Sequence, residues 1–282
     1  MPVKLLPAKI TISGTVLSLR MNKAGDHLFG WTDSKEVFTC SINDMIVRSF
    51  ETGDEIEIAK MSDNGNYLAV VYKNSKGDVF KIDGEKLFSF TTNVNQLMNE
   101  RLVSFFPSGN YLLAVAEENR ARIYDSTGAG LFYLTGHTGR VNSIDISPDG
   151  RFVVTASCDK KAIIWNFNHY TKKFSVYNTF TAHKDTVWSC EFNNTGKFIL
   201  TASADSMVKI WNLKCEEPFV YFYFLSNSIH GYCGFSPSYD VRLRKTEKHF
   251  KYMPQYYQKA YDARFATGHG SIIASNYIYN KN

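Results

Sequence analysis

The chain has little proline and no long apolar run. It holds 7 prolines in 282 residues, too few for an extended proline-rich linker, and 44% of its residues are hydrophobic. That hydrophobic share is typical of folded globular proteins rather than disordered ones. The longest apolar stretch, residues 219–225, is seven residues long, whereas a membrane-spanning helix needs about 20. We therefore expect a globular chain that does not insert into a membrane.

Cysteine is also scarce, and the spacing of the five residues is irregular. Their number is odd and no two of them form a CxxC pair, which excludes a zinc ribbon and a CxxC redox motif. The N-terminus lacks the apolar core of a signal peptide. These features predict an intracellular, cytoplasmic protein, with nuclear and cytoskeletal sites left open. The cysteines are at positions 40, 158, 190, 215 and 233.

Motifs of catalytic and cofactor sites are missing as well. The sequence contains no phosphate-binding loop of the GxxxxGK[ST] type, no GxGxxG after a strand, no HExxH and no GxSxG. Each of these motifs places reactive groups or backbone amides where the chemistry requires them. We therefore expect no catalytic residues, no bound metal and no cofactor.

Two segments of the chain repeat one pattern at matched spacing. In both, a histidine precedes an aspartate by 22 residues, and a tryptophan follows that aspartate by six. Between them lie a turn, an apolar run and an alternating strand. Over residues 131–213 this pattern resembles the WD40 repeat family, whose units run from a Gly-His-like to a Trp-Asp-like pair.

The resemblance implies a structural role for the polar residues of each unit. In the family, an aspartate, a histidine, a hydroxyl and a tryptophan form a hydrogen-bonded tetrad, which gives a buried indole N–H and imidazole the partners they need. The histidines would therefore be structural and not catalytic. The predicted tetrads are His137, Thr155, Asp159 and Trp165 in one unit, and His183, Thr201, Asp205 and Trp211 in the next.

A weaker form of the period extends upstream. Strand ends at Cys40, Ile82 and Tyr124 precede Trp165 and Trp211 at steps of 42, 42, 41 and 46 residues. The upstream units lack the histidine and the tryptophan, so we expect packing alone to hold them. The fold class predicted is an all-β, WD40-type β-propeller of six or seven blades, seven favoured, each a four-stranded antiparallel sheet.

The expected organisation is one propeller over residues 1–282, with five regular blades in residues 14–213 and irregular, basic and aromatic-rich blades in 227–282. Residues 230–238 look like part of a sixth unit, and residues 260–275 like the first two strands of a seventh. Because an open ring exposes strand edges, residues 8–12 are expected to close the last blade. Whether the chain is a fragment of a longer propeller stays open.

The net charge of +5 comes from the C-terminal part. Residues 227–282 hold eight Lys or Arg and three Asp or Glu, which leaves 24 of each sign in the rest of the chain. Basic residues interleaved with aromatics suit phosphate contact with base stacking, or an acidic peptide. A solvated loop is favoured over both, because the electrostatic attraction from one such cluster is modest. The candidate nucleic-acid or acidic-partner contacts are Arg242, Arg244, Lys245, Lys248 and Lys251.

A propeller offers a rigid binding surface. Its inter-blade loops and the turns between second and third strands ring one face, and the resemblance places contact positions at the start of the first strand and just before the turn aspartate. Trp188 is the most informative, because Trp and Arg anchors dominate interface energetics; the alternative is a tryptophan that lines the channel. The positions are Arg140, Asn142, Cys158, Thr186, Trp188 and Ala204.

The predicted function is a non-catalytic protein–protein interaction scaffold that holds one or more proteins in a larger assembly. Two other classes stay open. An RNA- or ribonucleoprotein-associated propeller would use the basic C-terminal segment, and an enzyme would need an active site on the channel face. The sequence names neither the partners nor the pathway.

Overall fold

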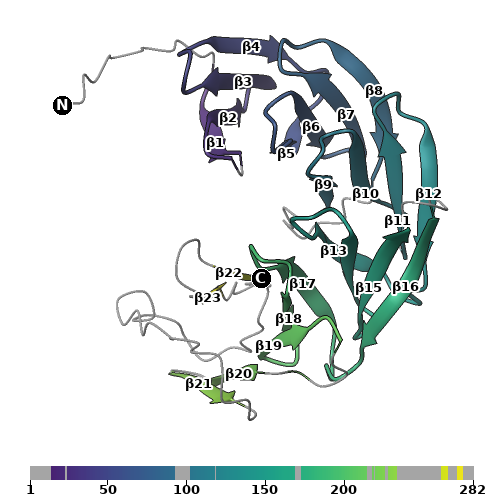
Figure 1. The fold of residues 1–282 in the computed structure, drawn as a ribbon. Helices are drawn as coiled ribbons and strands as arrows, with labels where there is room; N and C mark the ends of the chain where they lie inside the picture. The colour runs from purple at the N-terminus through teal and green to yellow at the C-terminus, as the bar shows by residue number, and fades with distance from the viewer. Residues whose placement is uncertain are drawn as a thin grey trace. The chain divides into compact units, whose positions relative to one another are not determined.

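The chain folds into β-strands. The computed structural model describes residues 14–22, 24–92, 102–117, 119–168, 173–214, 218, 220–225, 228–233, 262–265 and 272–275. Within these ranges all regular elements are strands, arranged as five sheets of four or five strands and one two-stranded sheet (Figure 1). We call the five larger sheets blades one to five, in chain order. The predicted all-β propeller architecture is confirmed, while the number of blades stays open.

Blades one and two lie in the first of two compact units, which spans Met1–Leu112 and Tyr124–Gly130. In both blades the strands are antiparallel and follow one another in chain order. Blade one consists of β1 (Val16–Met21), β2 (His27–Thr32), β3 (Glu36–Ser41) and β4 (Val47–Glu51). Blade two consists of β5 (Ile56–Met61), β6 (Tyr67–Tyr72), β7 (Lys76–Lys81) and β8 (Lys86–Thr91).

Blade three contains residues of both units, because the second unit spans Leu113–Ile123 and Leu131–Asn282. Its strand order is β12-β11-β10-β9. The strands are β9 (Val103–Phe105), β10 (Tyr111–Glu117), β11 (Arg120–Asp125) and β12 (Gly130–Thr135).

Blades four and five belong to the second unit. Blade four consists of β13 (Val141–Ile146), β14 (Phe152–Ser157), β15 (Ala162–Asn168) and β16 (Lys173–Phe180). Blade five consists of β17 (Val187–Phe192), β18 (Phe198–Ser203), β19 (Met207–Asn212), β20 (Val220–Leu225) and β21 (Ser228–Cys233). β21 pairs antiparallel with β20 as a fifth strand. Residues 230–238 were predicted to be part of a sixth unit, and the described part of that segment, in β21, instead pairs with the last strand of blade five.

The two-stranded sheet follows blade five. It pairs β22 (Asp262–Phe265) with β23 (Ile272–Ser275), and β22 lies beside β17 and β18. In the same way β17 lies beside β13 and β14 (Figure 1). The position of β22 relative to blade five thus repeats that of β17 relative to blade four, as expected of a first strand in the next blade.

Several predictions fall on residues outside the described ranges. These are the closing strand at residues 8–12 and the basic positions Arg242, Arg244, Lys245, Lys248 and Lys251.

None of the described elements is a helix long and apolar enough to cross a bilayer.

Each of the two units has an apolar cluster between successive blades. One cluster joins blades one and two through side chains such as Trp31, Val37 and Leu68. Another joins blades four and five, where Phe180 and Trp211 are 1% and 0% exposed. Burial on both faces is what allows the inner strands to be almost continuously apolar.

Candidate interaction surface on blades four and five

Both predicted tetrads have their four members within hydrogen-bonding distance. In blade four, Nδ1 of His137 lies 2.9 Å from Oδ2 of Asp159 and its Nε2 lies 2.7 Å from Oγ1 of Thr155. The indole N–H of Trp165 donates to the same hydroxyl at 3.0 Å. The four residues predicted from the sequence spacing thus lie in one hydrogen-bonded chain in the structure.

Blade five repeats this geometry. The distances are 2.9 Å from His183 Nδ1 to Asp205 Oδ2, 2.7 Å from His183 Nε2 to Thr201 Oγ1, and 2.8 Å from Trp211 Nε1 to the same Oγ1. Because an ionised Asp205 can only accept, the imidazole N–H at Nδ1 of His183 donates to it. Nε2 of His183 then accepts from the hydroxyl of Thr201, which itself accepts from the indole. Each donor in the chain then has an acceptor.

The electrostatics of blade five agree with this assignment. Burial lowers the pKa of His183, and this outweighs the opposing effect of Asp205, so the ring is neutral at pH 7. Burial raises the pKa of Asp205, but the hydrogen bond from His183 and other donors bring it below its ordinary value. A neutral histidine beside an ionised aspartate has no role in proton transfer to solvent, since both side chains are almost completely buried.

The first strand of four blades carries a β-bulge at the same place. The register shifts between Val141 and Ser143 in β13 and between Val187 and Ser189 in β17, and equivalent shifts occur in β1 and β5. The extra residue in blades four and five is Asn142 and Trp188, respectively. A bulge re-aims the side chain of its extra residue, so a shared backbone irregularity sets the position of both side chains.

The predicted contact residues lie in neighbouring pairs. The backbone N–H of Cys158 donates to the carbonyl of Arg140 at 2.8 Å, and that of Ala204 donates to the carbonyl of Thr186 at 2.8 Å. All four residues are half-buried, as is Trp188. They therefore lie at the same end of their blades and reach the surface in part.

The environment of Asn142 differs from the one expected of a residue that contacts a partner. It is 6% exposed, and its side-chain amide donates to the carbonyl of Val187 at 2.9 Å and contacts Sγ of Cys158 at 3.3 Å. Its carbonyl oxygen accepts a bond of 3.2 Å from Nε of Arg140. Asn142 thus connects blade four to blade five from within and holds the Arg140 side chain in place.

Two more side chains of β13 bind the backbone of β17, and the sequence analysis missed both. The hydroxyl of Ser143 accepts from the N–H of Cys190 at 3.2 Å, and the carboxylate of Asp145 accepts from the N–H of Phe192 at 2.7 Å. Asp145 is half-buried. Its period-two spacing from Ser143 is a signal that these residues face the neighbouring blade on one side of the strand.

Blade two contains a polar network in place of a tetrad, so the expectation that packing alone holds the upstream blades is wrong for this blade. The carboxylate of Asp78 accepts from the hydroxyls of Tyr72 at 2.9 Å and Ser89 at 2.7 Å, and it pairs with Nζ of Lys86 at 2.8 Å.

Among the described residues no three His, Cys, Asp or Glu side chains form a group that could hold a metal ion.

The matched sequence segments coincide with this part of the structure. Residues 129–166 and 174–212 match the family described as WD domain, G-beta repeat. These two segments of the chain are WD40 repeats. Each matched segment begins in the outer strand of one blade, β12 or β16, and continues through the three inner strands of the next. A WD40 repeat of this chain is therefore offset from a blade by one strand.

Several known proteins share short regions with this chain. It is 43% identical over 42 residues to U3 small nucleolar RNA-associated protein 13 of Saccharomyces cerevisiae, which covers 15% of this chain and 5% of that protein. It is 37% identical over 62 residues to Nuclear distribution protein PAC1 of Arthroderma benhamiae, 22% and 13% of the two chains. It is 28% identical over 114 residues to Actin-interacting protein 1 of Caenorhabditis elegans, 38% and 18%. The matches thus span less than a fifth of the length of these relatives.

Proposed function

We propose that this protein is a non-catalytic, intracellular scaffold that binds another protein through the surface formed by Arg140, Thr186 and Trp188. The observation that carries the proposal is the Asn142 side chain, which fixes Arg140 in blade four and the backbone of Val187 in blade five. Two neighbouring blades are thereby joined into one surface. A preformed surface loses little conformational freedom on binding, which favours affinity.

The chemistry of this surface suits a protein partner that carries an acidic or carbonyl group beside an apolar one. Arg140 uses its Nε to bind Asn142, and no carboxylate of the described part of the chain lies within ion-pair distance of it. Its terminal N–H groups can therefore donate to an acceptor on a partner. Trp188 adds a half-buried ring of the kind that anchors protein interfaces.

The test combines identification of the partner with matched variants. The full chain would be used as bait in a cell extract, and the protein recovered would be measured in a direct binding titration. Arg140→Ala and Trp188→Ala should each weaken binding at least thirtyfold, about 2 kcal/mol. Arg151→Ala is the matched control, because it removes the same charge from the turn at the other end of the same strand pair.

Unchanged affinity in both Arg140→Ala and Trp188→Ala would contradict the proposed surface. If binding instead fell steeply with salt and was lost when Arg242, Arg244 and Lys245 were changed to Glu, the basic segment would be the contact site. RNA association through that segment would then replace the scaffold proposal if the recovered partner were a ribonucleoprotein. One relative named above is associated with U3 small nucleolar RNA.

A further inference from the structure

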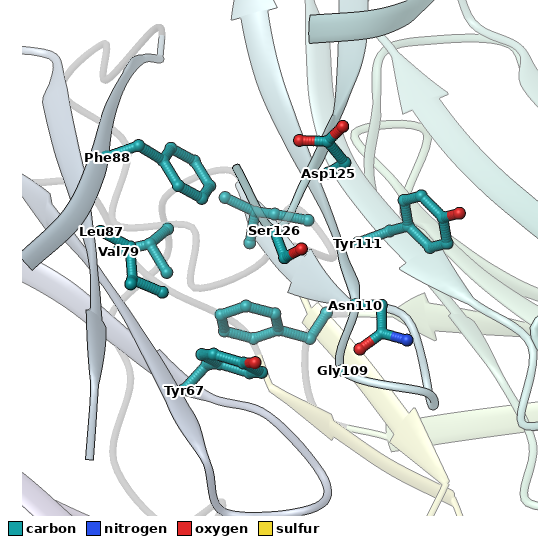
Figure 2. A pocket seen from close by; sticks show the side chains of 11 residues that line it. Tyr67, Val79, Leu87, Phe88, Gly109, Asn110, Tyr111, Asp125 and Ser126 are labelled. Carbon is teal, nitrogen blue, oxygen red and sulfur yellow. The ribbon is translucent and has the colours of Figure 1, made fainter. Parts of the chain in front are cut away.

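Exposed apolar side chains gather in the outer strands of blades three and four. In the described ranges, every exposed large hydrophobic residue outside blade one belongs to β12 or β16. These residues are 39% to 51% exposed and comprise Leu131, Tyr133, Val176 and Tyr177. By contrast, the hollow beside Phe88 and Asp125 (Figure 2) has room for about one water molecule. A partner would therefore bind at these outer strands rather than in that hollow.

Strand β12 has an open edge. It is the last strand of its sheet, with β11 on one side and no described strand on the other. Its sequence contains no charged residue and no proline, which are the features that protect open edges in natural proteins. The outer strands of the first two blades do carry charge, at Arg48 and Glu51 in β4 and at Lys86 in β8. Blade five shows that an outer strand of this chain can be extended, since β21 pairs with β20.

One face of β12 is apolar. The ring of Phe132 lies 6.0 Å from that of Phe174 in β16, and Phe174 lies 4.8 Å from Phe167 in β15. Val176 is two residues beyond Phe174 in the same strand, so it lies on the same face of blade four. Residues 131–135 and β16 belong to one compact unit. An apolar surface therefore extends from β12 to the exposed Val176 side chain.

The other face of β12 is positively charged. Tyr133 follows Phe132 in the strand, so its side chain points to the opposite face. The guanidinium carbons of Arg120 and Arg122 lie 5.4 and 4.9 Å from the centroid of its ring. The carboxylate of Glu117 pairs with Arg120 at 2.8 Å. With two guanidinium groups and one carboxylate, the described side chains around Tyr133 carry a net positive charge.

We propose that β12 binds an extended segment of another protein as an added β-strand, in which apolar residues alternate with acidic ones. Backbone hydrogen bonds to the open edge would hold the segment, and its successive side chains would lie on opposite faces. The apolar side chains would pack on the face that carries Phe132 and Val176. The acidic side chains would face Arg120 and Arg122, about 10 Å away across β12, a distance that arginine and glutamate side chains span together.

A second copy of this chain fits the edge less well than such a segment. Strand β12 has no acidic residue, and pairing two copies would add two more arginines to faces that are already positive. The proposed edge is separate from the surface around Trp188, so its test does not depend on that surface.

The first experiment uses a short capped peptide in which valine and glutamate alternate. It would be titrated into the full isotope-labelled chain and followed by NMR. We expect saturable shifts of the backbone amide signals of residues 131–135, while those of β4 stay in place. A peptide with lysine in place of glutamate should bind at least about threefold more weakly, because opposite charges on neighbouring strands stabilise their pairing.

Two modified peptides test whether the backbone edge is used. One is N-methylated at every valine and the other at every glutamate. The N–H groups of successive residues in a strand point to opposite edges, so only one of the two peptides should lose binding. Equal binding of these two peptides would overturn the proposal, as would equal binding of the lysine peptide or the absence of saturable shifts in β12.

Variants of the chain separate the two faces. Arg122→Gln should weaken binding of the glutamate peptide at least about twofold, and Val176→Ser should weaken binding of both the glutamate and the lysine peptide. Arg48→Gln is the matched control, because it removes the same charge from the outer strand of blade one, and it should bind as the unmodified chain does. Unchanged binding by both Arg122→Gln and Val176→Ser would contradict the proposed faces. Sedimentation of the chain alone completes the test, since a dimer that Tyr133→Lys dissociates would assign the edge to a second copy and overturn the proposal.

Discussion

Replacement of Trp211 tests whether the tetrads serve stability rather than binding. The indole is 0% exposed, lies 4.2 Å from the ring of Phe180 at an interplanar angle of 9°, and donates to Thr201 at 2.8 Å. Trp211→Ala removes a large buried ring, and such changes cost about 3–5 kcal/mol. The stacked partner places the expected cost at the upper end of this range.

A second substitution separates the hydrogen bond from the packing. Trp211→Phe keeps a ring over Phe180 but removes the N–H that Thr201 accepts, while Thr201 still donates to His183. We expect a loss of about 1–2 kcal/mol, mostly from the hydrogen bond.

The assay is thermal unfolding followed by far-ultraviolet circular dichroism. For a domain of 150–250 residues, 1 kcal/mol shifts the Tm by about 2–4 °C, so Trp211→Ala should lower it by about 6–20 °C. The control is Trp188→Ala, at a half-buried bulge in the same blade, which should shift the Tm by far less. If Trp211→Ala unfolded at the Tm of the unmodified chain while partner binding was lost, the structural role of the tetrads would be refuted.

Three further predictions follow from the polar contacts. The pKa of His183 is lowered by burial, so below about pH 6.5 the unfolded chain takes up a proton that the folded chain does not. The free energy of unfolding should therefore fall from pH 7 to pH 5. Urea titrations should show this fall, and they should show a smaller one for His183→Gln. Asn142→Ala leaves the carbonyl of Val187 without its donor and should cost about 1–3 kcal/mol in the same titrations; no loss would mean that the link between the blades is unimportant. Asp78→Ala removes the acceptor of the buried Tyr72 hydroxyl and should destabilise the chain by a similar amount, whereas unchanged stability would show that packing alone holds blade two.

The sequence was sufficient for features that lie within one repeat. The tetrad of blade five joins residues at most 28 positions apart, from His183 to Trp211, and all of them lie in or beside the three inner strands of that blade. Strand, turn and strand follow each other at fixed spacing there, so the spacing alone predicts which side chains meet. The period of about 42 residues likewise predicted sheets in the upstream blades where the family residues are missing.

Contacts between blades were decided only by the tertiary structure. Asn142 was predicted to face a partner, but a bulge turns it toward Val187, 45 residues further along the chain. Asp145 meets Phe192 across a similar separation. β21 joins blade five by backbone hydrogen bonds, which side-chain patterns do not encode.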